Sequence, residues 1–130
     1  MGGVVAIQLA LDFPGLVTHL VLTATSGSVD ISDLQVEDWR PTFHEANPTV
    51  PRRFADSRHD YTDRLSSVRA SVLLLWGDSD PISPVSVGLR LRSLLPRSAL
   101  HVIEGGEHYF AHKMDAAVVP LMDEHLARNG

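Results

Sequence analysis

Two turns in the second half of the sequence carry side chains that could act together on a substrate. The apolar run 73–76 leads into a turn with Asp78 and Asp80, and the apolar run 99–103 leads into a turn that ends at His108. A carboxylate can accept the Nδ1 proton of an imidazole and leave Nε2 free to take a proton from a nucleophile. Asp80 and His108 therefore have the chemistry of two members of a catalytic triad, although either could be an ordinary turn or surface residue.

The elements that must position this pair are two strands joined by a helix. Ser83 and Pro84 have the residue types of a helix start, and Pro96 ends the amphipathic stretch that comes after them. Such crossovers are nearly always right-handed and make the two strands parallel neighbours, about 4.8 Å apart. We therefore expect Asp80 and His108 to emerge at the same edge of the sheet, where open α/β sheets place their chemistry.

The first part of the chain adds a helix and a strand to this unit. Residues 19–24 form a short apolar run typical of a strand buried in a parallel sheet. Residues 4–13 are apolar on nearly every side, so this helix requires a covering neighbour. A last helix is expected over 114–126, with a kink or a late start at Pro120. The pattern predicts a three-stranded parallel sheet flanked by helices in one α/β domain, residues 1–130.

Residues 26–66 interrupt this alternation. They combine several acids, three prolines, arginines and scattered aromatic residues without a regular period. A segment this long without periodicity is usually functional or mobile, so we interpret it as a cap or lid. Its aromatic side chains could line an apolar substrate pocket or pack the lid onto the sheet.

Composition excludes several classes of function. The net charge is −5 and the basic residues are scattered, so we expect no nucleic-acid partner. No apolar run approaches the roughly 20 residues needed to cross a bilayer, so no membrane partner is expected either. The absence of cysteines excludes disulfides and thiolate metal sites and favours the cytoplasm.

One metal-binding alternative is open. His108 and His112 are spaced to share one face of a helix, with Glu107 beside them. A zinc site would need a third ligand and a helix that begins before His108, so we expect no metal and no cofactor.

The two turns resemble those of the α/β-hydrolase family. Gly77-Asp78-Ser79-Asp80 followed by Pro84 is similar to the family's acid turn, and Gly105-Gly106-Glu107-His108 is similar to its histidine turn. The resemblance implies that Asp80 is the acid, in preference to Asp78, and that His108 is the base.

The start of the sequence resembles the segment that comes directly after the nucleophile in that family. Met1-Gly2-Gly3 looks like the elbow Gly-x-Ser-Met-Gly-Gly cut just after its serine, so Met1 occupies a position whose backbone N–H would help hold an oxyanion. By resemblance the parent activity is cofactor-free hydrolysis of a small acyl substrate such as an ester by Ser, His and Asp. We expect the isolated chain to lack a nucleophile and to be inactive, and the codons before Met1 to encode Gly-x-Ser in frame.

A second interpretation belongs to a different class of function. The strand 19–24 and the helix 4–13 would each keep an uncovered edge or face, and such surfaces favour pairing with another chain. The chain would then be a non-catalytic fragment or assembly module that forms a homodimer through this strand and helix.

Overall fold

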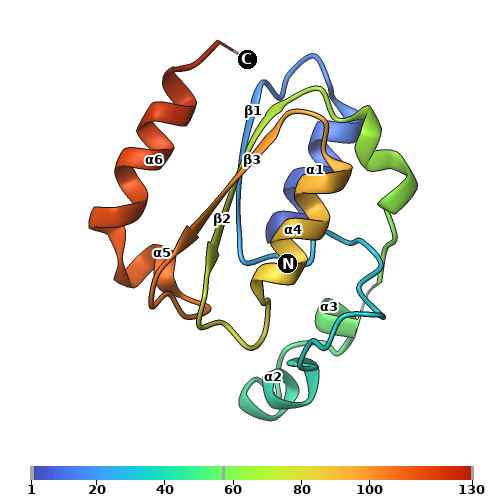
Figure 1. Cartoon of the computed structure of the whole chain (residues 1–130). Helices are drawn as coiled ribbons and strands as arrows, with labels where there is room; N and C mark the ends of the chain where they lie inside the picture. The colour runs from blue at the N-terminus through green and yellow to red at the C-terminus, as the bar shows by residue number, and fades with distance from the viewer. Residues whose placement is uncertain (1, 57, 130) are drawn as a thin grey trace.

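A computed structural model describes residues 2–56 and 58–129. The elements are α1 (Gly2–Asp12), β1 (His19–Thr23), α2 (Arg40–Ala46), α3 (Arg53–Asp56), the 3₁₀ helix η1 (Thr62–Ser67), β2 (Ser71–Gly77), α4 (Val85–Leu94), β3 (Ser98–Ile103), α5 (Phe110–Lys113) and α6 (Asp115–Ala127) (Figure 1).

The three strands form one parallel sheet in the order β1-β2-β3. Leu74 in the central strand β2 lies opposite Leu22 of β1 and Leu100 of β3. All residues of β2 after Ser71 are buried, because helices cover both faces of this strand. The predicted three-stranded parallel sheet, with β2 and β3 as neighbours, is confirmed.

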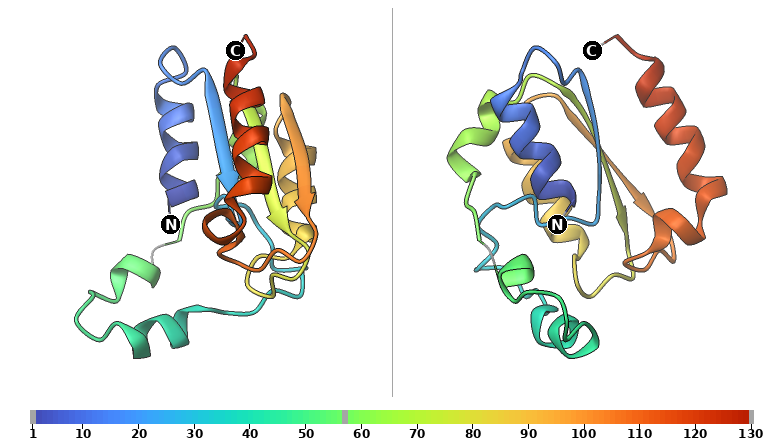
Figure 2. Two further views of the ribbon diagram at one scale, coloured as in Figure 1. Left: turned by 90° about the vertical axis from the view of Figure 1, so that its left-hand side faces the viewer. Right: turned by 180° about the vertical axis from the view of Figure 1, so that it is seen from behind.

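Helices cover the two faces of the sheet unequally. Figures 1 and 2 show α1 and α4 on one face and α6 on the other. Alternate side chains of β2 serve the two sides: Trp76 packs into the cluster with Ile7 and Leu91, and Leu75 packs into the cluster with Val118. This alternation is the period-two geometry of a strand, and it holds both strand-end turns on a rigid base.

The outer face of α1 is open to solvent. Val5, Leu9 and Phe13, here called the α1 stripe, expose 55%, 48% and 51% of their surface. Helix α1 packs on β1, which is an edge strand of the described sheet. The sequence predicted a helix in need of a covering neighbour, and within the described residues one face of α1 has none.

The structure corrects two expectations about helix starts. Helix α4 begins at Val85 with Pro84 as its N-cap residue, so the prediction of Ser83 as the cap is wrong. Helix α6 begins at Asp115 and continues through Pro120, so of the predicted kink or late start the late start is excluded. No helix within 2–56 and 58–129 has the length and apolar character needed to cross a membrane.

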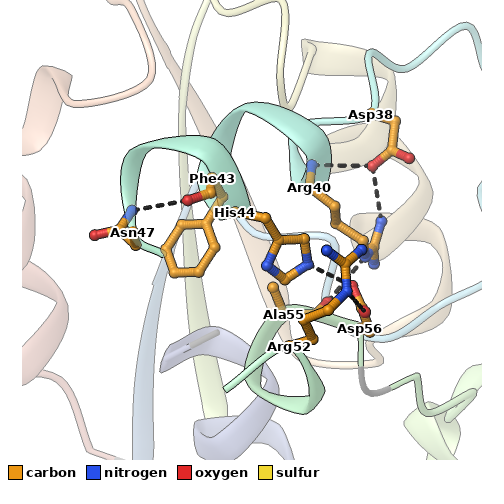
Figure 3. A network of polar contacts seen from close by, with 8 residues as sticks. All are labelled: Asp38, Arg40, Phe43, His44, Asn47, Arg52, Ala55 and Asp56. Carbon is orange, nitrogen blue, oxygen red and sulfur yellow. Dashed lines mark hydrogen bonds and ion pairs between the residues drawn. The ribbon is translucent and has the colours of Figure 1, made fainter. Parts of the chain in front are cut away.

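Residues 26–66, here called the cap segment, leave the sheet after β1 and return before β2. Figures 1 and 2 show its helices α2 and α3 beyond the end of the sheet toward which the strands point. Side-chain contacts hold these two short helices together (Figure 3): His44 Nε2 lies 2.7 Å from Asp56 Oδ1, and Arg40 Nε donates to the carbonyl oxygen of Ala55 at 2.9 Å. The hydrogen bond with His44 lowers the pKa of Asp56. Polar contacts therefore join α2 to α3, neither of which is long enough to be stable alone.

Candidate active site

Asp80 and His108 meet at the carboxyl-terminal edge of the sheet. The imidazole Nδ1 lies 2.8 Å from Asp80 Oδ2, a hydrogen-bonding distance. The Asp80 side chain has no exposed surface, whereas 28% of the His108 side chain is exposed. The predicted proximity is confirmed, and the imidazole is the member of the pair that solvent can reach.

Backbone donors fix the Asp80 carboxylate. Its Oδ1 accepts the N–H of Ile82 at 2.8 Å and the N–H of Ser83 at 2.9 Å, so Oδ2 is left for His108. The Ser83 hydroxyl oxygen in turn accepts the indole N–H of Trp76 at 3.2 Å. Ser83 thus supports the Asp80 carboxylate through its N–H. Its position before Pro84 is also typical of a helix cap, so this role could not be recognised from the sequence.

The two turns that carry the pair are packed against each other. A Cβ atom on Gly77 would lie 2.1 Å from the carbonyl oxygen of Gly106, so only glycine permits this approach. The Ser79 N–H donates to the same oxygen at 2.9 Å. The Asp78 carboxylate accepts the Gly105 N–H at 2.8 Å instead of contacting His108. The choice of Asp80 over Asp78 as the partner of His108 therefore agrees with the geometry.

His108 lines a cavity of about 1320 Å³. The cavity wall also includes the start of α1, the loop after β1, much of the cap segment, and the residues next to the pair, namely Ile82, Ser83 and Tyr109. The aromatic residues Trp39, Phe43 and Phe54 of the cap segment line it as well. Acid–base chemistry at one wall and apolar surface at another are the properties of a small-molecule site.

The loop after β1 has an unusual backbone. Ala24, Gly27 and Ser28 all have positive φ angles, of 47°, 62° and 54°. Non-glycine residues adopt this region only at a cost, and such strain is concentrated at functional sites. Ser26 and Ser28 of this loop line the cavity, but within residues 2–56 and 58–129 no serine hydroxyl is hydrogen-bonded to His108. In the part of the chain that the structure describes, the acid and the base are thus assembled without a serine hydroxyl bonded to the imidazole.

Two further predictions concern other chemistry. Met1, the predicted oxyanion position, lies outside the described residues. Among the described residues, no three His, Cys, Asp or Glu side chains are grouped so that they could hold a metal ion. Glu107 pairs with Lys113 at 4.0 Å, and the helix that contains His112 begins only at Phe110, after His108.

No family model matches the chain. Curated relatives do: a 2-hydroxy-6-oxononadienedioate/2-hydroxy-6-oxononatrienedioate hydrolase from Pseudomonas putida is 36% identical over 67 residues, 52% of this chain. A hydrolase of the same name from Escherichia coli is 33% identical over 95 residues, 73% of this chain. The matches span only 22% and 32% of these relatives.

Solved structures share the fold. An α/β-hydrolase enzyme from a lagoon-sediment metagenome matches 95% of the chain with a TM-score of 0.73 and 23% identity. A thermophilic esterase from Thermogutta terrifontis matches 96% with a TM-score of 0.75 and 19% identity. A meta-cleavage product hydrolase from Pseudomonas fluorescens matches 95% with a TM-score of 0.73 and 18% identity. The chain accounts for 56%, 61% and 61% of these structures.

Proposed function

Because the chain has the α/β-hydrolase fold and is homologous to hydrolases of this fold, we propose that it carries the acid–base pair of a hydrolase. One observation carries the proposal: a fully enclosed carboxylate is hydrogen-bonded to an imidazole that lines a large cavity. Structural ion pairs are common at surfaces, but few combine a buried acid, two backbone donors on its other oxygen and a base facing a cavity.

The geometry suits transfer of one proton in each half of the reaction. A hydroxyl nucleophile attacks a carbonyl carbon and gives its proton to Nε2 of His108, while Asp80 stabilises the imidazolium through Nδ1–H. The imidazolium then gives this proton to the leaving group as the bond to the carbonyl carbon breaks. A water molecule repeats the sequence on the acyl intermediate, releases the acid and restores the hydroxyl and the neutral imidazole.

The substrate we propose is a small acyl compound. Hydrolases of oxo-dienedioates and an esterase are among the relatives and structural neighbours, and an oxo group and an ester both offer a carbonyl carbon to a nucleophile. In the cap segment Trp39 lies edge-on to Phe43 with ring centroids 5.5 Å apart, and Phe54 stacks on Phe43 at 5.9 Å. These rings suit the apolar part of an acyl group, and the reaction needs no cofactor.

The proposed mechanism requires a nucleophile that contacts His108. Since no described serine does so, we propose that the chain alone is inactive and that the pair works when a serine hydroxyl reaches Nε2. The chain matches only about a third or less of the curated relatives, so the serine can belong to sequence beyond the matched part.

A fluorophosphonate probe, which labels activated serine hydroxyls, tests this function. We expect no stoichiometric labelling of the chain alone. We expect a fusion that adds the nucleophile-bearing part of a matched relative in front of the chain to be labelled at one serine. The label should be lost in His108→Ala and kept in Glu104→Ala, which changes an exposed acid on the same turn. Labelling of the fusion that survives His108→Ala would exclude His108 as the base.

A second candidate function is favoured by the α1 stripe. Exposed apolar side chains beside an open strand edge commonly mark an interface, and a homodimer that pairs β1 or exchanges α1 would cover both. Sedimentation equilibrium at micromolar concentration should then show a dimer of the 14.2 kDa chain, weakened at least tenfold by Leu9→Glu. A monomer that binds no dye for exposed apolar surface would exclude this assembly.

A further inference from the structure

Asp78 is an exposed acid whose carboxylate has a defined structural partner. Its Oδ1 accepts the Gly105 N–H at 2.8 Å and the Ser79 hydroxyl at 3.0 Å. Gly105 has a φ of +72°, a left-handed conformation that glycine adopts readily. A side chain from the turn after β2 therefore holds the backbone of the turn after β3.

This contact acts near the middle of the turn that carries His108. The turn is anchored before Gly105 by Ile103, the last residue of β3, and after His108 by Phe110, which is 1% exposed. Between these anchors, three hydrogen bonds join the turn to the turn after β2: the Ser79 N–H donates to the Gly106 carbonyl at 2.9 Å, the Gly105 N–H donates to the Asp78 carboxylate, and His108 bonds to Asp80. Loss of the Asp78 bond would leave the Ser79 N–H as the one connection between the turns besides the His108–Asp80 bond itself.

We propose that Asp78 is a positioning residue: its carboxylate oxygen fixes the turn 104–108 so that His108 Nδ1 meets Asp80 Oδ2. Asp78 touches neither member of the pair and acts through the Gly105 backbone. This role deepens the proposed function and rests on it for any effect on catalysis, but the placement of His108 can be measured without substrate or nucleophile.

Two substitutions separate an acceptor role from an effect of charge. Asp78→Asn keeps an oxygen that can accept the Gly105 N–H and removes the negative charge. Asp78→Ala removes both. If the oxygen matters, the two variants should differ; if only the charge near His108 matters, they should behave alike. Glu104→Ala is the matched control, because it removes an exposed acid from the turn that carries His108.

The measurement is the exchange of the His108 Nδ1 proton with water, followed by NMR of the ¹⁵N-labelled full chain. We expect about fivefold faster exchange in Asp78→Ala, the change that corresponds to one net hydrogen bond of about 1 kcal/mol. Asp78→Asn and Glu104→Ala should stay within about twofold of the unchanged protein on the same scale. Thermal unfolding of each variant shows whether the fold is retained.

Two results would overturn the proposal. One is unchanged exchange in Asp78→Ala; with a lowered melting temperature it would mark a merely structural role. The other is equal acceleration of exchange in Asp78→Asn and Asp78→Ala. Neither bears on whether a serine is activated. Failure of the positioning role and failure of the hydrolase proposal are therefore distinguishable.

Discussion

Replacement of Asp80 by alanine should destabilise the chain far more than a surface substitution would. The change leaves the N–H groups of Ile82 and Ser83 and the Nδ1–H of His108 without their acceptor. An unsatisfied buried donor costs about 1–3 kcal/mol. Ser83 is buried while Ile82 and His108 are partly exposed, so water can compensate the last two in part. We expect a loss of about 3 kcal/mol in the free energy of unfolding.

Asp80→Asn is the matched comparison. The amide oxygen can still accept the two backbone N–H groups, but its NH₂ then faces the Nδ1 of His108, where a second donor cannot be accommodated without a change of tautomer. The expected loss is about 1 kcal/mol, the value of one net hydrogen bond. His108→Ala should cost a similar amount, because it breaks one hydrogen bond, the bond to Oδ2.

Urea unfolding followed by tryptophan fluorescence and by circular dichroism measures all three variants. A loss below about 0.5 kcal/mol in Asp80→Ala would show that the backbone donors find other partners. Equal losses in Asp80→Ala and Asp80→Asn would show that charge, and not the accepted hydrogen bonds, supports the turn.

Three further outcomes are expected from the packing and the charges. Gly77→Ala should cost about 1–3 kcal/mol and accelerate exchange of the His108 Nδ1 proton, since its Cβ would press on the Gly106 carbonyl, whereas Gly15→Ala, with nothing within 4 Å, should do neither. The hydrogen bond to His44 lowers the pKa of Asp56, so the ionised carboxylate stabilises the folded chain at pH values above the ordinary pKa of 3.8. This stabilisation is lost as the pH falls through the lowered pKa. Asp56→Asn should therefore remove part of the acid-induced loss in stability. Burial of the side chain, followed by the charge of His19, lowers the pKa of His125. Below about pH 6.5 the imidazole is therefore protonated more readily in the unfolded chain than in the folded chain, and the folded chain loses stability. His125→Leu should flatten the fall in melting temperature from about pH 7 to about pH 5. An unchanged slope in either the histidine or the aspartate variant would contradict the corresponding assignment.

The sheet and the acid–base pair could be predicted from the sequence because both depend on regular geometry. A run such as Leu73-Leu74-Leu75, apolar on both strand faces, indicates a central parallel strand. Two such strands joined by a helix must end at the same edge, which places Asp80 and His108 at one edge of the sheet.

The supporting contacts could not be predicted, because they depend on loop conformations that tertiary packing selects. Ser83 has the local pattern of a helix cap, but the indole N–H of buried Trp76 needs an acceptor and takes the hydroxyl. The role of Asp78 depends on the left-handed conformation of Gly105, which no local pattern specifies. The cap helices α2 and α3 have no period to read and are joined by side-chain contacts such as His44 with Asp56.

The hydrolase and the homodimer make opposite demands on the free edge of β1. A strand that pairs with β1 in parallel has its carboxyl end at the same end of the sheet as His108. The residue that follows this strand could then contact Nε2 of His108. A two-fold axis perpendicular to the sheet instead makes the two β1 strands antiparallel, so the partner's strand ends at the far edge. A symmetric β1 pair therefore cannot deliver a nucleophile to the site.

Engineered cysteines can distinguish the two arrangements, because the chain has no native cysteine. In an antiparallel pair centred on the axis, the two copies of Val21, the middle residue of β1, face each other, whereas the two copies of Thr23 lie at opposite ends of the pair. Oxidation should then cross-link Val21→Cys and leave Thr23→Cys uncross-linked, since a disulfide needs Cα atoms within about 7 Å. That result would show that a second copy occupies the edge that a nucleophile-bearing strand would need. Equal cross-linking at both positions would rule out the centred antiparallel pair, and a monomer without cross-links would leave the edge open to a parallel strand.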